Sequence, residues 1–315
     1  MALVGNAVRS DKVIHLPTGG DMGMLYDSLD RSGAIGSMTR LHVAASLLKL
    51  DERNYHPGAY RLTRGMSYIR VARMLRRGLQ TPVRVTFNNL RSLESLSAAL
   101  ARQLEPDSAA FARVLTDAAT ARRMGFTPQT FMAMMIPDTY QFYWNTSSEG
   151  FVERMRKEYD RFWNGERTSR LAALGMTREQ VVTLASIVYE ETKRTDEMAT
   201  VAGVYVNRLR IGMALQADPT VKFAVGNFAL RRIRGAALAS DSPYNTYKHA
   251  GLPPGPICMP SVAAIDATLG YGHHNYLYFC AKPDYSGYHN FSTTLEQHNR
   301  YGAIYHRWLD SEGIR

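Results

Sequence analysis

The sequence predicts an α+β protein in three parts: a small α/β module at residues 11–80, a mostly helical connecting segment at residues 81–175, and a mixed α/β domain at residues 176–315. Short strand and helix signals alternate in the first part, and helical periodicity dominates the second. Amphipathic helices and one strand pattern make up the third. The length of 315 residues and the hydrophobic content of 45% suit about two packed domains.

Two strand signals enclose two helix signals in the first part. In chain order, these strand, helix, helix and strand patterns fall at residues 13–16, 22–29, 41–50 and 58–62. A further helix is expected over residues 67–77, where Gly78 closes it. This order of elements predicts a small α/β fold.

The connecting segment begins with a strand pattern at residues 83–87 and is otherwise mostly helical. An aromatic-rich turn at Pro137–Trp144 interrupts its helices. In the third part, residues 252–256 contain three prolines, which fix φ and remove backbone donors. We expect a stiff loop there that shapes a cleft. Residues 277–281 alternate as in a core strand.

The helix predicted at residues 177–191 carries a carboxyl group at the edge of its apolar face. Thr177 and Gln180 match a capping box at its start. At 100° per residue, Glu191 borders the apolar face that includes Val188, whereas Glu190 points toward solvent. An apolar environment disfavours the charged form, so the pKa of Glu191 should rise toward the range of a general acid. A solvated helix end is the alternative for such paired glutamates.

The composition points to anionic partners but to no nucleic-acid site. The net charge is +10, and the basic residues are widely spread, with the tightest group at Arg231, Arg232 and Arg234. No nucleic-acid-binding motif accompanies them. The nine histidines show no metal-ligand spacing, so we expect neither a metal nor a cofactor. No stretch approaches the roughly 18–20 apolar residues of a membrane span.

A series of short motifs occurs in a fixed order in the third part. It comprises Asn207–Leu209, Gly212–Val221, Tyr244–Tyr247, Gly251–Ile257, Tyr276–Phe279, Gly287–Phe291 and His298–Asn299. This series resembles the endolytic murein transglycosylases, the MltG or YceG-like family. The dense part of the match runs from Ala185 to Asn299, and weaker similarity extends it over most of the chain.

The resemblance implies a lytic enzyme of peptidoglycan. Such enzymes cut the β-1,4 bond between N-acetylmuramic acid and N-acetylglucosamine without water and leave 1,6-anhydro ends. The family's catalytic glutamate lies in the pattern Glu-Lys-Glu-Thr and maps onto Glu191. This chain departs from that pattern at Tyr189 and Glu190. The extra charge of Glu190 should raise the pKa of Glu191 slightly if the two groups are close.

A single carboxyl suits this reaction, because Glu191 would first donate a proton and then accept one. Ordinary glycosidases need two carboxyls, and Asp218 is the only attractive second candidate. Asp218-Pro219 also matches a helix N-cap followed by proline at the first helical position, which we favour. As a hypothesis, Asp218 caps a helix and organises the cleft wall near Glu191.

The matched motifs also supply candidate substrate-binding residues. These residues could hydrogen-bond N-acetyl and lactyl groups, although each alone could instead brace a loop: Asn207, Arg208, Gln216, Asp218, Tyr244, Asn245, Thr246 and His289. Aromatic faces stack on sugar rings, so the cluster Tyr140, Tyr143 and Trp144 is a weaker candidate. Core packing is the commoner role for such a cluster.

The family context implies further expectations. The first part resembles a LysM-like module, which either binds glycan or acts as a spacer. Family members carry an N-terminal membrane anchor at the extracytoplasmic face of the bacterial inner membrane, facing the periplasm. We expect this chain to be the part that follows such an anchor. Cell-wall synthases are implied as neighbours, with the enzyme limiting nascent strand length. Because of Tyr189, the alternative is a catalytically silent peptidoglycan-binding scaffold.

Overall fold

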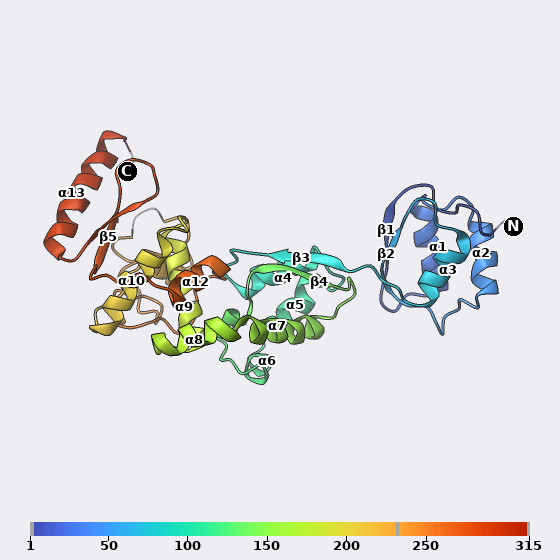
Figure 1. Ribbon diagram of the computed structural model, residues 1–315, viewed down its shortest axis with the longest axis horizontal. Coiled ribbons are helices and arrows are strands. Elements are labelled where there is room, and N and C mark those ends of the chain that lie inside the picture. Colours follow the sequence, from blue (N-terminus) through green and yellow to red (C-terminus); the bar gives the residue numbers. More distant parts are fainter. Residues whose placement is uncertain (1–2, 231–232, 314–315) are drawn as a thin grey trace. The chain divides into compact units, whose positions relative to one another are not determined.

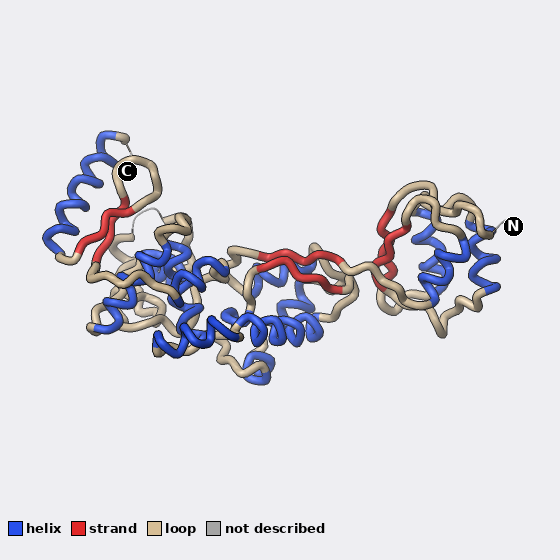
Figure 2. The backbone as a smooth tube through the Cα atoms, in the orientation of Figure 1, coloured by secondary structure: helices blue, strands red, loops and turns tan. Residues whose placement is uncertain are grey.

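The computed structural model describes residues 3–230 and 233–313, which form helices and two-stranded sheets (Figure 2). The chain divides into two compact units. The first contains residues 3–87, 97–114 and 139–151, and the second contains residues 88–96, 115–138, 152–230 and 233–313. The mixed α/β class matches the expectation from the sequence, whereas the three boundaries predicted at residues 80, 175 and 315 remain predictions.

The first unit starts with an antiparallel pair of strands and three helices (Figure 1). Strand β1 (Lys12–Leu16) pairs with β2 (Gly58–Leu62), and the helices are α1 (Met22–Arg31), α2 (Met38–Leu47) and α3 (Tyr68–Arg76). The predicted strand, helix, helix, strand order is therefore present. The shared core is fully apolar apart from tyrosine hydroxyls and includes Ile14, Leu16, Leu25, Leu29, Leu41, Tyr60, Leu62, Val71 and Leu75.

The helix expected at residues 41–50 begins and ends earlier than predicted. Ser37 caps it by accepting a hydrogen bond from the backbone N–H of Arg40. The chain then leaves the helix at Lys49, whose φ of 52° is left-handed. A serine cap therefore overrides the later start that apolar periodicity indicated.

The rest of the first unit contains the second sheet. Strand β3 (Val83–Phe87) pairs with β4 (Asp138–Phe142), so the aromatic-rich turn predicted at Pro137–Trp144 is wrong. Its partner strand lies about fifty residues earlier, and such pairing has no local signal. Tyr140 packs on Phe87 with ring centroids 5.8 Å apart. Helices α4 (Leu93–Ala101), α5 (Ser108–Leu115) and α7 (Ser148–Phe162) have residues in both units.

The second unit is built around α9 (Arg178–Glu191), which packs against three other helices. These are α10 (Met198–Arg210), α11 (Asp218–Ala224) and α12 (Val262–Leu269). The capping box of Thr177 and Gln180 is present, and every residue from Val181 to Val188 is buried. The remaining helical elements are α6 (Ala118–Arg123), η1 (Phe131–Met134) and α8 (Gly165–Leu174).

The C-terminal end of the second unit is a hairpin followed by a long helix (Figure 1). Strand β5 (Tyr278–Ala281) pairs with β6 (His289–Ser292), and α13 (Leu295–Ser311) packs against both strands. The predicted strand is present, but all four residues of β5 are only half-buried, so it is not a core strand. Helix α10 also contacts β5, and the four residues of β5 line a cavity.

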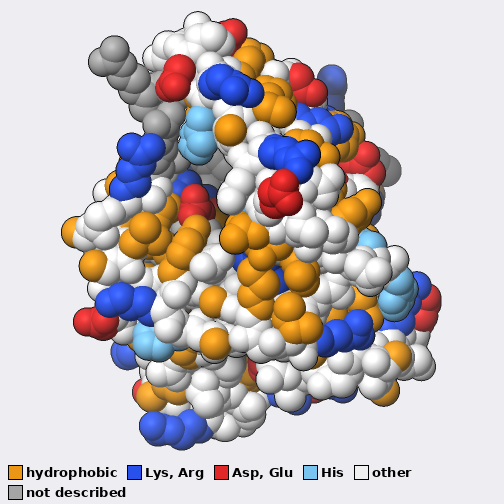
Figure 3. Space-filling view, turned by 90° about the vertical axis from the view of Figure 1, so that its left-hand side faces the viewer, with side chains coloured by type: hydrophobic (Ala, Val, Ile, Leu, Met, Phe, Trp, Pro, Cys, Tyr) orange, Lys and Arg blue, Asp and Glu red, His pale blue; other side chains and the backbone are white. Residues whose placement is uncertain are grey.

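The basic charge of the chain is dispersed on the face seen in Figure 3. Lys and Arg side chains are scattered there among hydrophobic and acidic ones. Of the predicted basic group, Arg231 and Arg232 lie outside the described residues. Within residues 3–230 and 233–313, no single helix is long and apolar enough to cross a membrane. By length and composition alone, α8 and α9 would pass together as a pair bent by 86°.

Candidate active site

Glu191 is the last residue of α9 and lines a cavity of about 560 Å³. The backbone turns from helical to extended at Thr192, so the helix ends where its carboxylate-bearing residue reaches the cavity. One wall comes from α9, α10 and α11, and the other from β5, β6 and α13. The sequence placed this carboxyl group at the edge of the apolar helix face, and in the structure that edge borders a cleft.

The environment of Glu191 makes it an effective proton donor at neutral pH. Burial raises the pKa of its carboxyl from 4.5 to about 7, and the negative charge of Asp218 adds to the rise. A hydrogen bond from Tyr205 and the positive charges of Lys222 and Arg208 lower that pKa, but burial outweighs them. A carboxyl with a pKa near 7 can both release and accept a proton at that pH. The predicted direction is confirmed.

Tyr205 is a site residue that the sequence did not reveal. Its hydroxyl donates a 2.7 Å hydrogen bond to Oε1 of Glu191. The side chain is 1% exposed, and its ring meets Phe279 edge-on at 5.8 Å. On periodicity alone, Tyr205 belongs to the apolar face of the helix at Met198–Arg210. The one feature of the sequence that could have indicated this role was the hydroxyl, because a buried tyrosine hydroxyl usually needs a hydrogen-bond partner.

Asp218 lies in the same cavity, but it does not cap its helix. Helix α11 starts at Asp218 itself, and the preceding Ala217 makes no side-chain cap. The Asp218 carboxylate instead accepts a 2.6 Å hydrogen bond from the hydroxyl of Tyr247, which also lines the cavity. The predicted N-cap is therefore wrong, because this carboxylate has a stronger partner across the cleft wall than its own backbone.

Arg208 places a buried positive charge behind the cleft. Its side chain donates to the backbone oxygens of Leu277 at 2.6 Å and Leu215 at 2.7 Å. Its guanidinium carbon lies 5.2 Å from the ring centroid of Tyr278. Burial lowers the pKa of Arg208, whereas Glu191 acts in the opposite direction. Arg208 thus joins the two walls and holds a positive charge near two carboxylates.

His289 is fixed at the cavity by a second carboxylate, that of Glu197. The backbone N–H of His289 donates to Oε1 of Glu197 at 2.8 Å, and its Nδ1 lies 2.6 Å from Oε2. Both side chains are nearly buried, at 12% and 7% exposure. The sequence did not indicate Glu197, because its partner is ninety-two residues away and no local pattern connects them.

The other predicted substrate-binding residues separate into two groups. Gln216 lines the cavity with a φ of 51°, a left-handed conformation that is rare for this residue type. Three residues hydrogen-bond to the protein itself, and none lines this cavity: Asn207 donates to the carbonyls of His274 and Tyr276, Asn245 to those of Leu238 and Ser240, and Thr246 pairs with Thr220. Tyr244 lines a different pocket of about 260 Å³, beside Phe223.

Glu190 does not point into solvent. Its side chain is 12% exposed and pairs with Arg91 at 2.7 Å and with Lys193 at 3.5 Å. The segment that carries Arg91 precedes α4 and could not be placed beside α9 from helical periodicity. Burial and Asp218, not Glu190, raise the pKa of Glu191. The expected effect of the extra glutamate is therefore not among the causes of the raised pKa, and the charge of Glu190 is paired with two cations.

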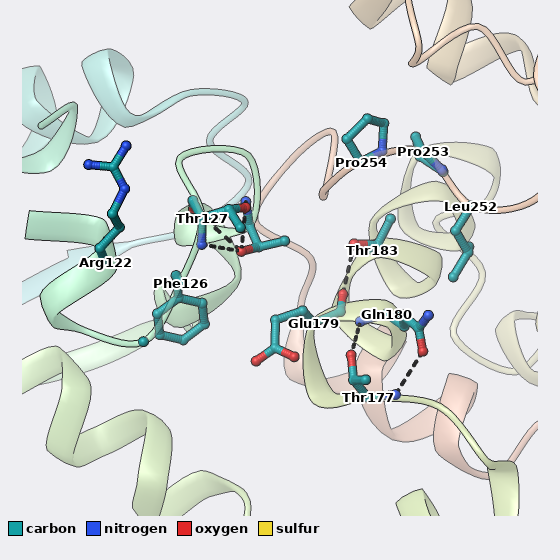
Figure 4. A pocket seen from close by; sticks show the side chains of 12 residues that line it. Arg122, Phe126, Thr127, Thr177, Glu179, Gln180, Thr183, Leu252, Pro253 and Pro254 are labelled. Atoms are coloured by element: carbon teal, nitrogen blue, oxygen red, sulfur yellow. Dashed lines mark hydrogen bonds between the residues drawn. The ribbon is translucent and has the colours of Figure 1, made fainter. Parts of the chain in front are cut away.

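A second cavity of about 490 Å³ lies at the opposite end of α9 (Figure 4). Its walls include Phe126 on one side and Leu252–Pro254 on the other, so the stiff proline loop shapes this cavity. Glu179 also lines it and accepts a hydrogen bond from the hydroxyl of Tyr159 at 3.0 Å. Because α9 rises about 1.5 Å per residue, this cavity lies roughly 20 Å from Glu191.

Comparison with known proteins agrees with this architecture. Residues 14–303 match the model of the YceG-like family. A crystal structure of a yceG-like protein from Listeria monocytogenes superposes with a TM-score of 0.62 at 24% identity, covering 93% of this chain and 99% of that one. That likeness concerns the fold.

Two curated relatives are each named endolytic murein transglycosylase. The Bacillus subtilis protein is 35% identical over 167 residues, which are 53% of this chain and 45% of the relative. The Streptococcus pneumoniae D39 protein is 31% identical over 170 residues, which are 53% of this chain and 30% of the relative. The chain thus matches less than half the length of either relative. Because the family model covers nearly all of its sequence, the chain belongs to the YceG-like family.

Proposed function

We propose that this chain is a peptidoglycan lytic transglycosylase that cuts within glycan strands, with Glu191 as its acid and then its base. The observation that supports this most is a single carboxyl, with its pKa raised to about 7, in a cavity of about 560 Å³. The relatives named endolytic murein transglycosylase point to the same substrate class.

The reaction requires Glu191 to donate one proton and then to accept one. Protonated Glu191 donates its proton to the glycosidic oxygen as the bond from that oxygen to the anomeric carbon of N-acetylmuramic acid breaks. The C6 hydroxyl of the same sugar then attacks the anomeric carbon, and the Glu191 carboxylate takes the hydroxyl proton. The products are a 1,6-anhydro end and a free 4-hydroxyl, and the enzyme returns to its starting state without consuming water.

Asp218 has a supporting role in this proposal. Its carboxylate raises the pKa of Glu191 and is held by the Tyr247 hydroxyl. A hydrolase that used Asp218 as a second carboxyl would leave reducing ends instead of anhydro ends. The chemical nature of the new end therefore separates the two mechanisms.

The finer expectations of the family complete the proposal. The paired strands and the helices of residues 11–80 form a LysM-like module, and the protein acts at the periplasmic face of the inner membrane behind an N-terminal anchor. Its partners are glycan strands and the cell-wall synthases, beside which it limits strand length. The antiparallel pairing of β1 with β2, which α1 and α2 separate in sequence, supports the module assignment.

Mass spectrometry of uncross-linked glycan strands tests this function. The wild-type protein should produce anhydro-muramyl ends, and Glu191→Gln should produce none. Asp218→Asn serves as the matched control and should still yield anhydro ends at a lower rate. If the wild-type protein binds the strands but leaves them intact, a silent scaffold becomes the better description. The feature that favours this alternative is Tyr189, which departs from the Glu-Lys-Glu-Thr pattern that the family resemblance implies.

A further inference from the structure

One histidine in the cavity wall has no role in the mechanism above. His298 lies on α13 and lines the same cavity as Glu191, but it belongs to the opposite wall. Its ring stacks on Tyr278, with centroids 5.3 Å apart and planes inclined by 23°. The guanidinium of Arg208 also lies over the Tyr278 ring. The imidazole is therefore held in a fixed orientation at the cleft.

The two ring nitrogens of His298 differ in their surroundings. Nδ1 is buried and has no hydrogen-bond partner among the described residues. An unpaired buried N–H is rarer in proteins than an under-used acceptor, so the proton is better placed on the other nitrogen. Burial and the charge of Arg208 both lower the pKa of His298, which keeps the ring neutral. Nε2 then carries the single N–H, and it is the nitrogen available to a ligand.

We propose that His298 is a substrate-binding residue whose Nε2–H donates a hydrogen bond to an uncharged oxygen of an N-acetylated saccharide in the cavity. This inference rests on the proposed function for the identity of the ligand. Acetamido carbonyls and sugar hydroxyls are neutral acceptors, which suit a neutral imidazole donor.

The position of α13 extends this contact into a saccharide subsite. Leu295, Asn299 and His306 line the same cavity and lie on one face of the helix. They span eleven residues, or roughly 16 Å of helix. His298 therefore lies on the border of a helix wall long enough to follow a strand beyond the bond that is cut. The wall opposite carries Glu191, so one strand can contact both.

Two substitutions distinguish a donor at Nε2 from a merely stacked ring. The side-chain nitrogen of glutamine can reach the position of Nε2, whereas that of asparagine reaches only the position of Nδ1. We expect His298→Gln to keep kcat/KM for anhydro-end formation within about threefold of wild type. His298→Asn should lose roughly tenfold, mostly in KM, as expected for one hydrogen bond to substrate. Equal losses in both variants, or a tolerated asparagine, would overturn the proposal.

The same two substitutions are also tested in a binding assay, so that the His298 proposal can fail independently of the catalytic proposal. Sedimentation with uncross-linked glycan strands is measured in the Glu191→Gln background, which forms no product. His298→Gln should bind as tightly as this parent, and His298→Asn roughly tenfold more weakly. If strands bind with this pattern but the wild type never cuts them, the catalytic function fails and the His298 contact stands. If the full chain does not bind strands at all, both proposals fail.

Discussion

The hydroxyl of Tyr205 donates a 2.7 Å hydrogen bond to Oε1 of Glu191, and it opposes the effect of burial on that carboxyl. The bond stabilises the ionised form, so it lowers a pKa that would otherwise lie above about 7. Tyr205 thus sets how much of Glu191 is ionised at neutral pH.

Removing this hydroxyl should move the pH dependence of the reaction upward. In Tyr205→Phe, the pKa of Glu191 should rise by up to about one unit, because one neutral hydrogen bond to the carboxylate is lost. The alkaline limb of the kcat/KM profile for anhydro-end formation should shift in the same direction. An unchanged limb would show that another group controls it.

The neighbouring carboxylate, Asp218, allows a matching test in which the expected shift of the Glu191 pKa has the opposite sign. Asp218 raises the pKa of Glu191, so Asp218→Asn should lower that pKa and move the alkaline limb to lower pH. The new ends should remain anhydro ends. Reducing ends in the wild type that disappear in this variant would instead identify Asp218 as part of a hydrolytic pair.

The raised pKa also predicts how stability depends on pH. Folded Glu191 keeps its proton up to about pH 7, whereas the unfolded carboxyl loses it near 4.5. The folded state therefore binds more protons between these values, and stability falls as pH rises through them. Glu191→Gln removes this penalty. By urea unfolding, the variant should be more stable than wild type at pH 8, by at most about 3 kcal/mol, and should lose this advantage at pH 4.5.

Glu190 offers a test of the ion pair that compensates its charge. The pair with Arg91 is 2.7 Å long, and the two side chains are 12% and 40% exposed. In a double-mutant cycle with Glu190→Gln and Arg91→Met, we expect a coupling free energy of roughly 1 kcal/mol, measured by urea unfolding. A coupling near zero would mean that solvent screens the pair fully.

Local patterns predicted helix α9 well, because its determinants lie close in sequence. The capping box and the apolar face that ends at Glu191 follow from residues within one element. The groups around that carboxyl were harder to find: Tyr205, its hydrogen-bond partner, reads as an apolar helix position, and Tyr247, which hydrogen-bonds Asp218, comes from a separate loop. Local periodicity does not record which residue of another element reaches a given side chain.

Three of the incorrect predictions share this cause. The β4 strand depends on pairing with β3, Glu190 on the segment that carries Arg91, and Asp218 on the Tyr247 hydroxyl. In each case a contact distant in sequence outweighed the local preference for a turn, a solvated charge or a helix cap. The order of the motifs indicated the family, because motifs far apart in the sequence together carry information about such long-range contacts.

Two helical glycines predict opposite effects of the same substitution. A Cβ on Gly203 of α10 would lie 2.3 Å from the backbone oxygen of Gly272 and 2.6 Å from Nε2 of His274. On Gly302 of α13, the same atom would meet nothing within 4 Å. Gly203→Ala should therefore cost roughly 1–3 kcal/mol of unfolding free energy, because the backbone of Gly272 would have to move.

Gly302→Ala is the matched control, because it changes helix propensity without a clash. It should be neutral or stabilise the protein by up to about 1 kcal/mol. Urea unfolding of both variants measures the difference directly. Because α10 also carries Tyr205, a displaced helix in Gly203→Ala should weaken the hydrogen bond to Glu191. Any activity that remains should then show the upward shift of the alkaline limb expected for Tyr205→Phe. A destabilised variant with an unshifted limb would show that the part of α10 that carries Tyr205 stays in place although its packing against Gly272 is disturbed.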